Sequence, residues 1–213
     1  MEKLKPVELF LGRMQPLHNG HKKIIDSMKN PIVVIVKGKK SGADAERNPL
    51  DEEYQKKLIE MIFPGLEVSI SPNGFLPGIL GYFRKQGKEV TKIYAGADRI
   101  AGYQDAINRA NEKMPEDQRY RVTFQETERV TSATTVRNAI KSGDKDTFKK
   151  LVPSAIWGEW DTLRKKLGVM KEGILKFGQW MEDAAVTTTV AIKDAQKDIP
   201  LGPMVRRKRK RGA

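Results

Sequence analysis

The sequence predicts an α/β protein, a Rossmann-like doubly wound parallel sheet with a helical C-terminal extension. Three observations predict this class. Short apolar runs alternate with stretches whose apolar residues have helical spacing. The helix-like stretches are long enough to carry the chain between parallel strands. Residues suited to phosphate follow the first and the last expected strand, and sheets of this kind bind ligands at the carboxyl ends of their strands.

The length and composition set the expected domain organisation. The 213 residues are 38% hydrophobic, which is enough for one domain with a substantial core and an appendage. We expect this domain over residues 1–163, a helical extension over residues 164–198 and an extended basic tail over residues 199–213. Within these last segments, Leu167 to Ala185 is expected to be helical, and the prolines of residues 199–203 favour an extended chain.

The elements are expected in a regular order along the chain. Short apolar or β-branched runs predict strands at Val7 to Gly12, Pro31 to Lys37, Leu66 to Ile70, Lys92 to Gly96 and Arg121 to Gln125. Apolar residues that share one helical face predict helices at His21 to Lys29, Glu52 to Ile62, Gly78 to Gln86 and Arg99 to Met114. A further helix is expected between a cap at Thr131 or Ser132 and a stop at Gly143.

His18 and His21 are the two histidines of the chain, and they lie between the first strand and the first helix. Backbone N–H groups at a helix N-terminus are unpaired and the helix dipole is positive there, so an anion can bind in front of Gly20 and His21. Gly12 and Gly20 let the backbone approach such an anion, and the imidazoles can donate hydrogen bonds to phosphoryl oxygens. Two alternatives are a simple helix-capping turn and a metal site. A metal site would need carboxylate partners from elsewhere, because the chain has no cysteine.

A second candidate phosphate-binding segment runs from Thr131 to Arg137. Its hydroxyl groups can cap the following helix, and the planar guanidinium of Arg137 near the first turn suits phosphate. The alternative is an ordinary Ser/Thr cap with a nearby arginine.

The segment GRMQPLHNGH, from Gly12 to His21, resembles the GRxQPxHxGH signature of archaeal-type nicotinamide mononucleotide adenylyltransferases, within the HxGH nucleotidyltransferase superfamily. TSATTVR, from Thr131 to Arg137, resembles the ISSTxxR element of the same family. The resemblance implies a nucleotidyltransferase fold in which His18, His21 and Arg137 stabilise the reacting phosphates. It implies nucleotide contacts from Gly12, Arg13, Gln15, Gly20, Thr131, Ser132 and Thr134. Ala133 and Thr131 depart from the family pattern, which has a second serine and an aliphatic residue there.

Other segments also resemble this family. Asp146 to Trp157 resembles its short C-terminal helical region. Glu46 to Leu50 is similar to its RNPF segment, which implies that Arg47 approaches phosphate or the acceptor; the alternative is a solvated loop arginine. Lys92 to Asp98 is similar to a strand end with a GxD element, which implies that Gly96 and Asp98 lie against the nucleotide. The alternative for Asp98 is a cap on the next helix.

The resemblance implies transfer of AMP from ATP to nicotinamide mononucleotide, with release of pyrophosphate and with Mg²⁺ on the triphosphate. The acceptor is less defined, because relatives stack nicotinamide on a tryptophan in the middle of the chain. Here the middle offers Phe75, Tyr82 and Phe83, and the tryptophans are all C-terminal. Phosphopantetheine, or a phosphorylated alcohol paired with CTP, stays an alternative acceptor.

The basic C-terminal end suggests a second class of function. Arg206 to Arg211 supply six of the formal +13 charges, and such a run stays solvated unless it binds nucleic acid or another polyanion. The chain could thus be a nucleic-acid-associated or virion component that docks through this tail. No apolar run suits a membrane span, there is no disulfide framework, and MEKLKPVELF is too charged for a signal peptide. We expect a cytoplasmic protein, or a virion-associated one if it comes from a phage, and it could be oligomeric.

Overall fold

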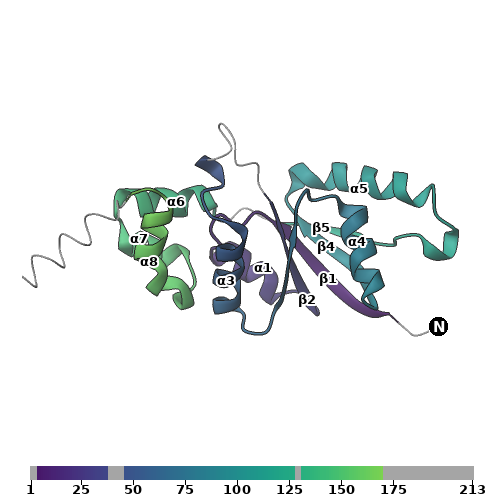
Figure 1. The fold of residues 1–213 in the computed structure, drawn as a ribbon, viewed down its shortest axis with the longest axis horizontal. Coiled ribbons are helices and arrows are strands. Elements are labelled where there is room, and N and C mark those ends of the chain that lie inside the picture. The colour runs from purple at the N-terminus through teal and green to yellow at the C-terminus, as the bar shows by residue number, and fades with distance from the viewer. Residues whose placement is uncertain (1–3, 38–45, 128–130, 170–213) are drawn as a thin grey trace, which may run out of the picture. The chain divides into compact units, whose positions relative to one another are not determined.

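The computed structural model describes residues 4–37, 46–127 and 131–169. The chain divides into two units, Met1–Val169 and Met170–Ala213. The expected extension and basic tail fall outside the described residues from residue 170 onward, so those expectations stay predictions. The described residues form a five-stranded parallel sheet with strand order β3-β2-β1-β4-β5, which confirms the predicted doubly wound α/β class (Figure 1).

The strands lie where the apolar runs predicted them, with shifts at their ends. Their bounds are β1 Lys5–Gly12, β2 Pro31–Val36, β3 Glu67–Ser71, β4 Lys88–Ala95 and β5 Thr123–Glu126. β4 begins at Lys88 and not at Lys92, because β1 and β4 are central strands that pair from Lys5 and Lys88 onward. Because the first residues of β4 are charged, the hydrophobic pattern did not indicate this part of the strand.

The helices fall on both faces of the sheet and in a group beyond it (Figure 1). Their bounds are α1 Asn19–Asp26, α3 Glu52–Ile62, α4 Leu76–Lys85, α5 Ala97–Asn111, α6 Ala133–Ser142, α7 Lys145–Leu151 and α8 Trp160–Lys166, with short 3-10 helices Glu116–Gln118 and Ser154–Glu159. α6 ends at Gly143, whose φ of 79° is left-handed as predicted for a glycine stop. Among the described residues, none of the helices is long and apolar enough to span a membrane.

Alternate residues of the strands point to opposite faces of the sheet and build two cores. On one face, Ile25 of α1 and Ile59 of α3 pack against Phe10, Val33 and Ile35. On the other face, α4 and α5 cover the sheet; this core contains Leu9, Leu11, Ile32, Val34, Leu76, Ile79, Phe83, Ile93 and Ile107. The helix carrying the histidines and helix α4 therefore lie on opposite faces.

A third core joins α3 to the helices that follow the sheet. Tyr54 and Leu58, on α3, pack with residues of α6, α7 and α8; this core includes Val136, Ile140, Phe148, Ile156, Trp160 and Leu163. Helix α8 continues to Lys166 and so passes through the expected domain boundary at residue 163. Residues 167–169 form a turn, so the helix expected over Leu167 to Ala185 does not begin at Leu167, and the rest of that range lies outside the described residues.

Candidate functional site

The candidate site lies at the carboxyl ends of β1 and β4, the two strands between which the strand order reverses. From β1 the chain continues to β2 on one side, while from β4 it continues to β5 on the other. The loop after β1 leads into α1, and Gly96 after β4 leads into α5. Two helix N-termini are therefore presented at the crevice where open α/β sheets bind ligands.

His18 and His21 form a reciprocal cap at the start of α1. Nδ1 of His18 accepts a hydrogen bond from the backbone N–H of His21, and Nδ1 of His21 accepts one from the backbone N–H of His18, both at 3.4 Å. The rings stack with their centroids 3.7 Å apart and an interplanar angle of 17°. The alternative of a helix-capping turn is thus present in the structure. Each cap uses the Nδ1 of its ring, so Nε2 takes no part in the cap.

The caps determine which nitrogen of each ring carries the proton. An Nδ1 that accepts a hydrogen bond has no proton, so a neutral ring capped in this way is protonated at Nε2. Burial lowers the pKa of His18 to about 4. Burial, together with repulsion by the charge of a protonated His18, lowers the pKa of His21 to about 3. Near neutral pH the pair therefore presents two uncharged Nε2–H donors.

The start of α6 lies beside the histidine loop. A Cβ placed on Gly20 would be 3.0 Å from Cε1 of His18 and 3.8 Å from the backbone nitrogen of Thr131. The chain at Gly20 therefore passes directly against the His18 ring, and any larger residue would press on it. The two segments that the sequence singled out, distant along the chain, meet at this point.

Ser132 is the N-cap of α6. Of the two candidates that the sequence left open, Thr131 and Ser132, the structure therefore has Ser132. Its Oγ accepts a hydrogen bond from the backbone N–H of Thr135 at 3.1 Å, and the two hydroxyl groups are 2.9 Å apart. Thr131 precedes the cap and is half-buried next to Gly20. Free N–H groups in the first turn of α6 are thus presented next to the histidine pair.

Arg137 is buried and binds the histidine loop. Its Nη1 donates to the backbone oxygen of Gln15 at 2.6 Å, and its Nη2 donates to Oγ1 of Thr134 at 3.1 Å. A guanidinium has five N–H groups, so these bonds leave three for other acceptors. Arg137 therefore holds the loop in place, and Thr134 holds Arg137.

Gln15 has a role that its sequence position did not indicate. Its side-chain Nε2 donates to the backbone oxygen of Leu50, and its Oε1 accepts from the backbone N–H of Leu50, both at 2.9 Å and buried. Nε2 of Gln55 donates to the same Leu50 oxygen. The Gln15 amide thus joins the histidine loop to the start of α3. The spacing of residues in the sequence does not indicate which backbone groups a buried side-chain amide binds.

Charged side chains gather around Arg137. Burial lowers the pKa of Arg137, the negative charge of Glu46 raises it, and the positive charges of Arg13 and Arg47 lower it further. Arg13 and Arg47 are exposed. Nζ of Lys141 lies 2.9 Å from Oε1 of Glu46. Among the described residues, Glu46 interacts with Lys141, Arg137 and Arg47, and Arg13 interacts with Arg137, so the positive charges of this group outnumber its carboxylate and favour binding of an anion.

The remaining predicted residues follow the ends of β1 and β4. A Cβ on Gly12 would meet Met14 and Phe10 at ordinary contact distances of 3.5 Å or more, so space does not require glycine there. Gly96 is the N-cap of α5, and this excludes the alternative that Asp98 caps the helix. Asp98 is exposed in the first turn, with its Oδ2 3.7 Å from Nε of Arg99. A carboxylate in this turn is favourable to the helix dipole.

The helices beyond the sheet brace the histidine loop from the other side. Nδ2 of Asn19 donates to the backbone oxygen of Lys150 at 2.9 Å, which ties α1 to α7. Among residues 4–37, 46–127 and 131–169, no three histidine or carboxylate side chains gather closely enough to hold a metal ion.

No family model and no curated protein matches the sequence. Among solved structures, the chain is similar to Thermotoga maritima TmcAL, in the crystal structure with bound alpha-thio ATP (Form II), at a TM-score of 0.47 and 13% sequence identity. The alignment covers 78% of this chain and 56% of TmcAL, so the chain spans little more than half of that protein.

Proposed function

We propose that the protein is a nucleotidyltransferase that transfers AMP from ATP to the phosphate of a small acceptor and releases pyrophosphate. The observation that carries the proposal is the meeting of two stacked imidazoles with the N-terminus of α6, where Gly20 lies between His18 and Thr131. Nicotinamide mononucleotide is the first acceptor to test, because of the resemblance of the histidine loop to its adenylyltransferases.

The proposed reaction needs placement and charge stabilisation. An oxygen of the acceptor phosphate attacks the α-phosphorus of ATP, the bond to the β-phosphate bridging oxygen breaks, and pyrophosphate leaves with that electron pair. In this proposal the Nε2–H groups of His18 and His21 donate to the oxygens on which charge develops. They do so without adding net charge, and they are already oriented by their caps, which reduces the reorganisation that the reaction requires.

The positive groups have separate roles in the same proposal. Arg13 and Arg47 are exposed and can reach the outer phosphates, while the first turn of α6 offers backbone N–H groups. Arg137 and Gln15 act as positioning residues, because their observed bonds hold the loop that carries the histidines. Mg²⁺ enters as part of the nucleotide substrate, bound by its phosphates, and neutralises part of their charge.

The three aromatic residues that the middle of the chain offers differ in their exposure. Phe83 is 0% exposed within the core between α4 and the sheet, so it has no surface to offer a base. Phe75 and Tyr82 are exposed, but they belong to α4, on the face opposite α1. We therefore propose none of the three as the acceptor contact, and the acceptor is left for experiment.

The direct test is release of pyrophosphate. The full chain is incubated with Mg²⁺ and either ATP or CTP against nicotinamide mononucleotide, phosphopantetheine and a phosphorylated alcohol. We expect ATP with nicotinamide mononucleotide to release pyrophosphate, and His21→Ala to lower turnover by about a hundredfold or more, as loss of a preorganised donor does. Failure of every combination, or an unchanged rate for His21→Ala, would refute the proposal.

A further inference from the structure

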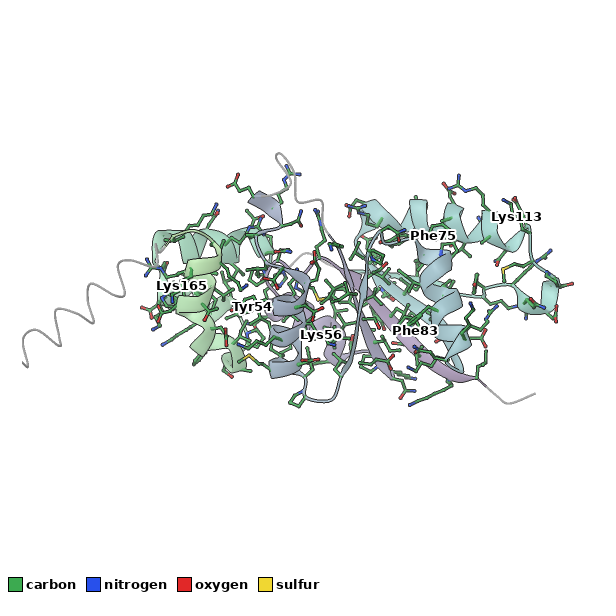
Figure 2. The ribbon with its side chains drawn as sticks, in the orientation of Figure 1. Tyr54, Lys56, Phe75, Phe83, Lys113 and Lys165 are labelled. Carbon is green, nitrogen blue, oxygen red and sulfur yellow. The ribbon has the colours of Figure 1, made fainter. Side chains whose placement is uncertain are left out.

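The two parts of the candidate site stand on different parts of the fold. His18 and His21 belong to the start of α1, which packs on the sheet, whereas the N-terminus of α6 belongs to the helices beyond the sheet. Figure 2 shows Tyr54 on α3 beside these helices, one of which, α8, carries Lys165. The distance between the histidine pair and the start of α6 therefore depends on contacts that join α1 to these helices.

Asn19 makes a direct contact of this kind. It is the first residue of α1 and lies between the N-cap His18 and Gly20. Its Nδ2 donates to the backbone oxygen of Lys150 at 2.9 Å, and the two residues are 131 positions apart in the chain. In the segment that resembles the HxGH signature, Asn19 stands at the position that the signature leaves open. The resemblance therefore assigns no role to this side chain.

The Lys150 oxygen has a well-defined position, because it belongs to the end of α7. The last carbonyl groups of an α-helix have no partner within the helix, so they are free to accept from side chains. Nε1 of Trp157 donates to the oxygen of Lys149 at 3.2 Å, and the Asn19 amide supplies a donor to the next oxygen. α7 packs with α6 in the core that these helices share. Asn19 therefore links the start of α1 to a helix end that is itself held against α6.

Two other contacts join the same parts of the fold, and they lie before and after Asn19 in the chain. Nη1 of Arg137 donates to the backbone oxygen of Gln15, and Gly20 passes against the start of α6. Removing Arg137 would delete a positive charge, and enlarging Gly20 would press on the His18 ring. The Asn19 amide can be removed without either effect, so its removal isolates the effect of position.

We propose that Asn19 is a positioning residue, which holds His18 and His21 at a fixed distance from the N-terminus of α6 so that both parts contact one polyphosphate. This role rests on the proposed transferase function. Asn19 touches no substrate in it, because its amide nitrogen is bound to α7. A misplacement of reacting groups by about 1 Å can lower a rate about a hundredfold. The Asn19 contact should therefore affect turnover more than binding of ATP.

Pyrophosphate release by Asn19→Ala tests the effect on the reaction. The variant, prepared as the full chain, is assayed with ATP, Mg²⁺ and nicotinamide mononucleotide. We expect kcat to fall about tenfold and the dissociation constant for ATP to change by less than about threefold, because the charged groups of the site are retained. Asn108→Ala removes an exposed amide that bonds to Gln104 on α5, and it should leave both values within about twofold. An unchanged kcat in Asn19→Ala would overturn the proposal.

The choice of alanine separates this role from a general effect on α1. Alanine forms helices better than asparagine, and the N-cap His18 is retained in the variant. If Asn19 only stabilised the helix, alanine would serve equally well and kcat would not fall. Circular dichroism and urea unfolding check that Asn19→Ala and Asn108→Ala are both folded.

The distance between α1 and α6 can be measured without any reaction. The chain has no cysteine, so Lys23→Cys on α1 and Asn138→Cys on α6, both at exposed positions, introduce a single pair of sites for spin labels. Electron paramagnetic resonance should give a broader or shifted distance between the labels when Asn19→Ala is added, and the same distance when Asn108→Ala is added. An unchanged distance with Asn19→Ala would refute the positioning role. A changed distance in a chain that never releases pyrophosphate would support that role and refute the transferase function, so the two can fail separately.

Discussion

The imidazoles of His18 and His21 stack 3.7 Å apart, and the Nδ1 of each accepts a hydrogen bond from the backbone of the other. This arrangement makes one pair of side chains responsible for two things. It caps α1, and it holds both rings with the proton on Nε2, outside the cap. Protonation of Nδ1 would remove the acceptor that the cap requires, so the structure depends on neutral rings.

The first prediction concerns acid. The folded-state pKa values are about 4 for His18 and about 3 for His21, against an ordinary value of 6.5. Below pH 6.5 the unfolded chain therefore binds more protons than the folded chain. The contribution of the two histidines to the free energy of unfolding is greatest above that pH. It falls as the pH falls toward the folded-state pKa values, by up to about 1.4 kcal/mol per pH unit for each histidine. Urea unfolding measured at about pH 7 and about pH 5 checks this expectation.

His21→Asn is the control for that measurement. The variant has one histidine fewer to titrate, so its free energy of unfolding should change less between the two pH values. Equal free energies for the unmodified chain at both pH values would contradict neutral burial of the pair.

The second prediction separates the cap from the donor at His18. His18→Ala removes the side chain that caps α1 and should lower the free energy of unfolding by about 1 kcal/mol or more. His18→Asn supplies an oxygen that can cap the helix, and it should recover part of that loss. Both variants lack the Nε2–H donor, so both should release pyrophosphate about a hundredfold more slowly. Normal activity in His18→Asn would show that His18 serves as a cap alone.

The third prediction concerns the buried amide of Gln15. Gln15→Ala leaves the buried backbone N–H of Leu50 without its partner, while the Leu50 oxygen keeps only the bond from Gln55. We expect a loss of about 1–3 kcal/mol in the free energy of unfolding, measured by urea denaturation. Gln104→Ala, on the exposed side of α5, is the matched control and should change stability by less than about 0.5 kcal/mol. A loss of stability no larger than that of the control would show that the hydrogen bonds between Gln15 and Leu50 are not formed in solution.

The fourth prediction tests the charges around Arg137. Arg47→Ala removes an exposed positive charge next to the proposed phosphate position and should raise the dissociation constant for ATP about threefold to tenfold. Arg109→Ala removes an exposed arginine from the last turn of α5 and should not change it. Glu46→Gln should lower the dissociation constant for ATP, because the Glu46 carboxylate competes with the phosphates of ATP for the same positive side chains. Isothermal titration calorimetry with ATP measures whether each variant raises or lowers the dissociation constant. Equal effects of Arg47→Ala and Arg109→Ala would show that Arg47 does not contribute to ATP binding.

Local sequence features placed most of the elements. Apolar periodicity located all five strands, and α3 has the bounds that its pattern predicts. The ends differed where local chemistry is ambiguous. Helix α5 begins at Ala97, two residues before the expected start, because the glycine at position 96 serves as its cap without a side chain. Helix α8 was not expected as a separate element, since its apolar residues, Trp160 and Leu163, form a pattern too short to stand out.

The sequence by itself determined the class of fold, the stop at Gly143 and the two segments suited to phosphate, and it limited the cap of α6 to Thr131 or Ser132. These features depend on residues close together in the chain, where spacing and backbone preference act directly. Only the tertiary structure decided that Gly20 meets Thr131, that Gln15 binds Leu50, and that α4 packs on the face of the sheet opposite α1. Such contacts join residues far apart in the chain, and they follow from the strand order and from the face of the sheet on which each helix packs, neither of which a periodic pattern specifies.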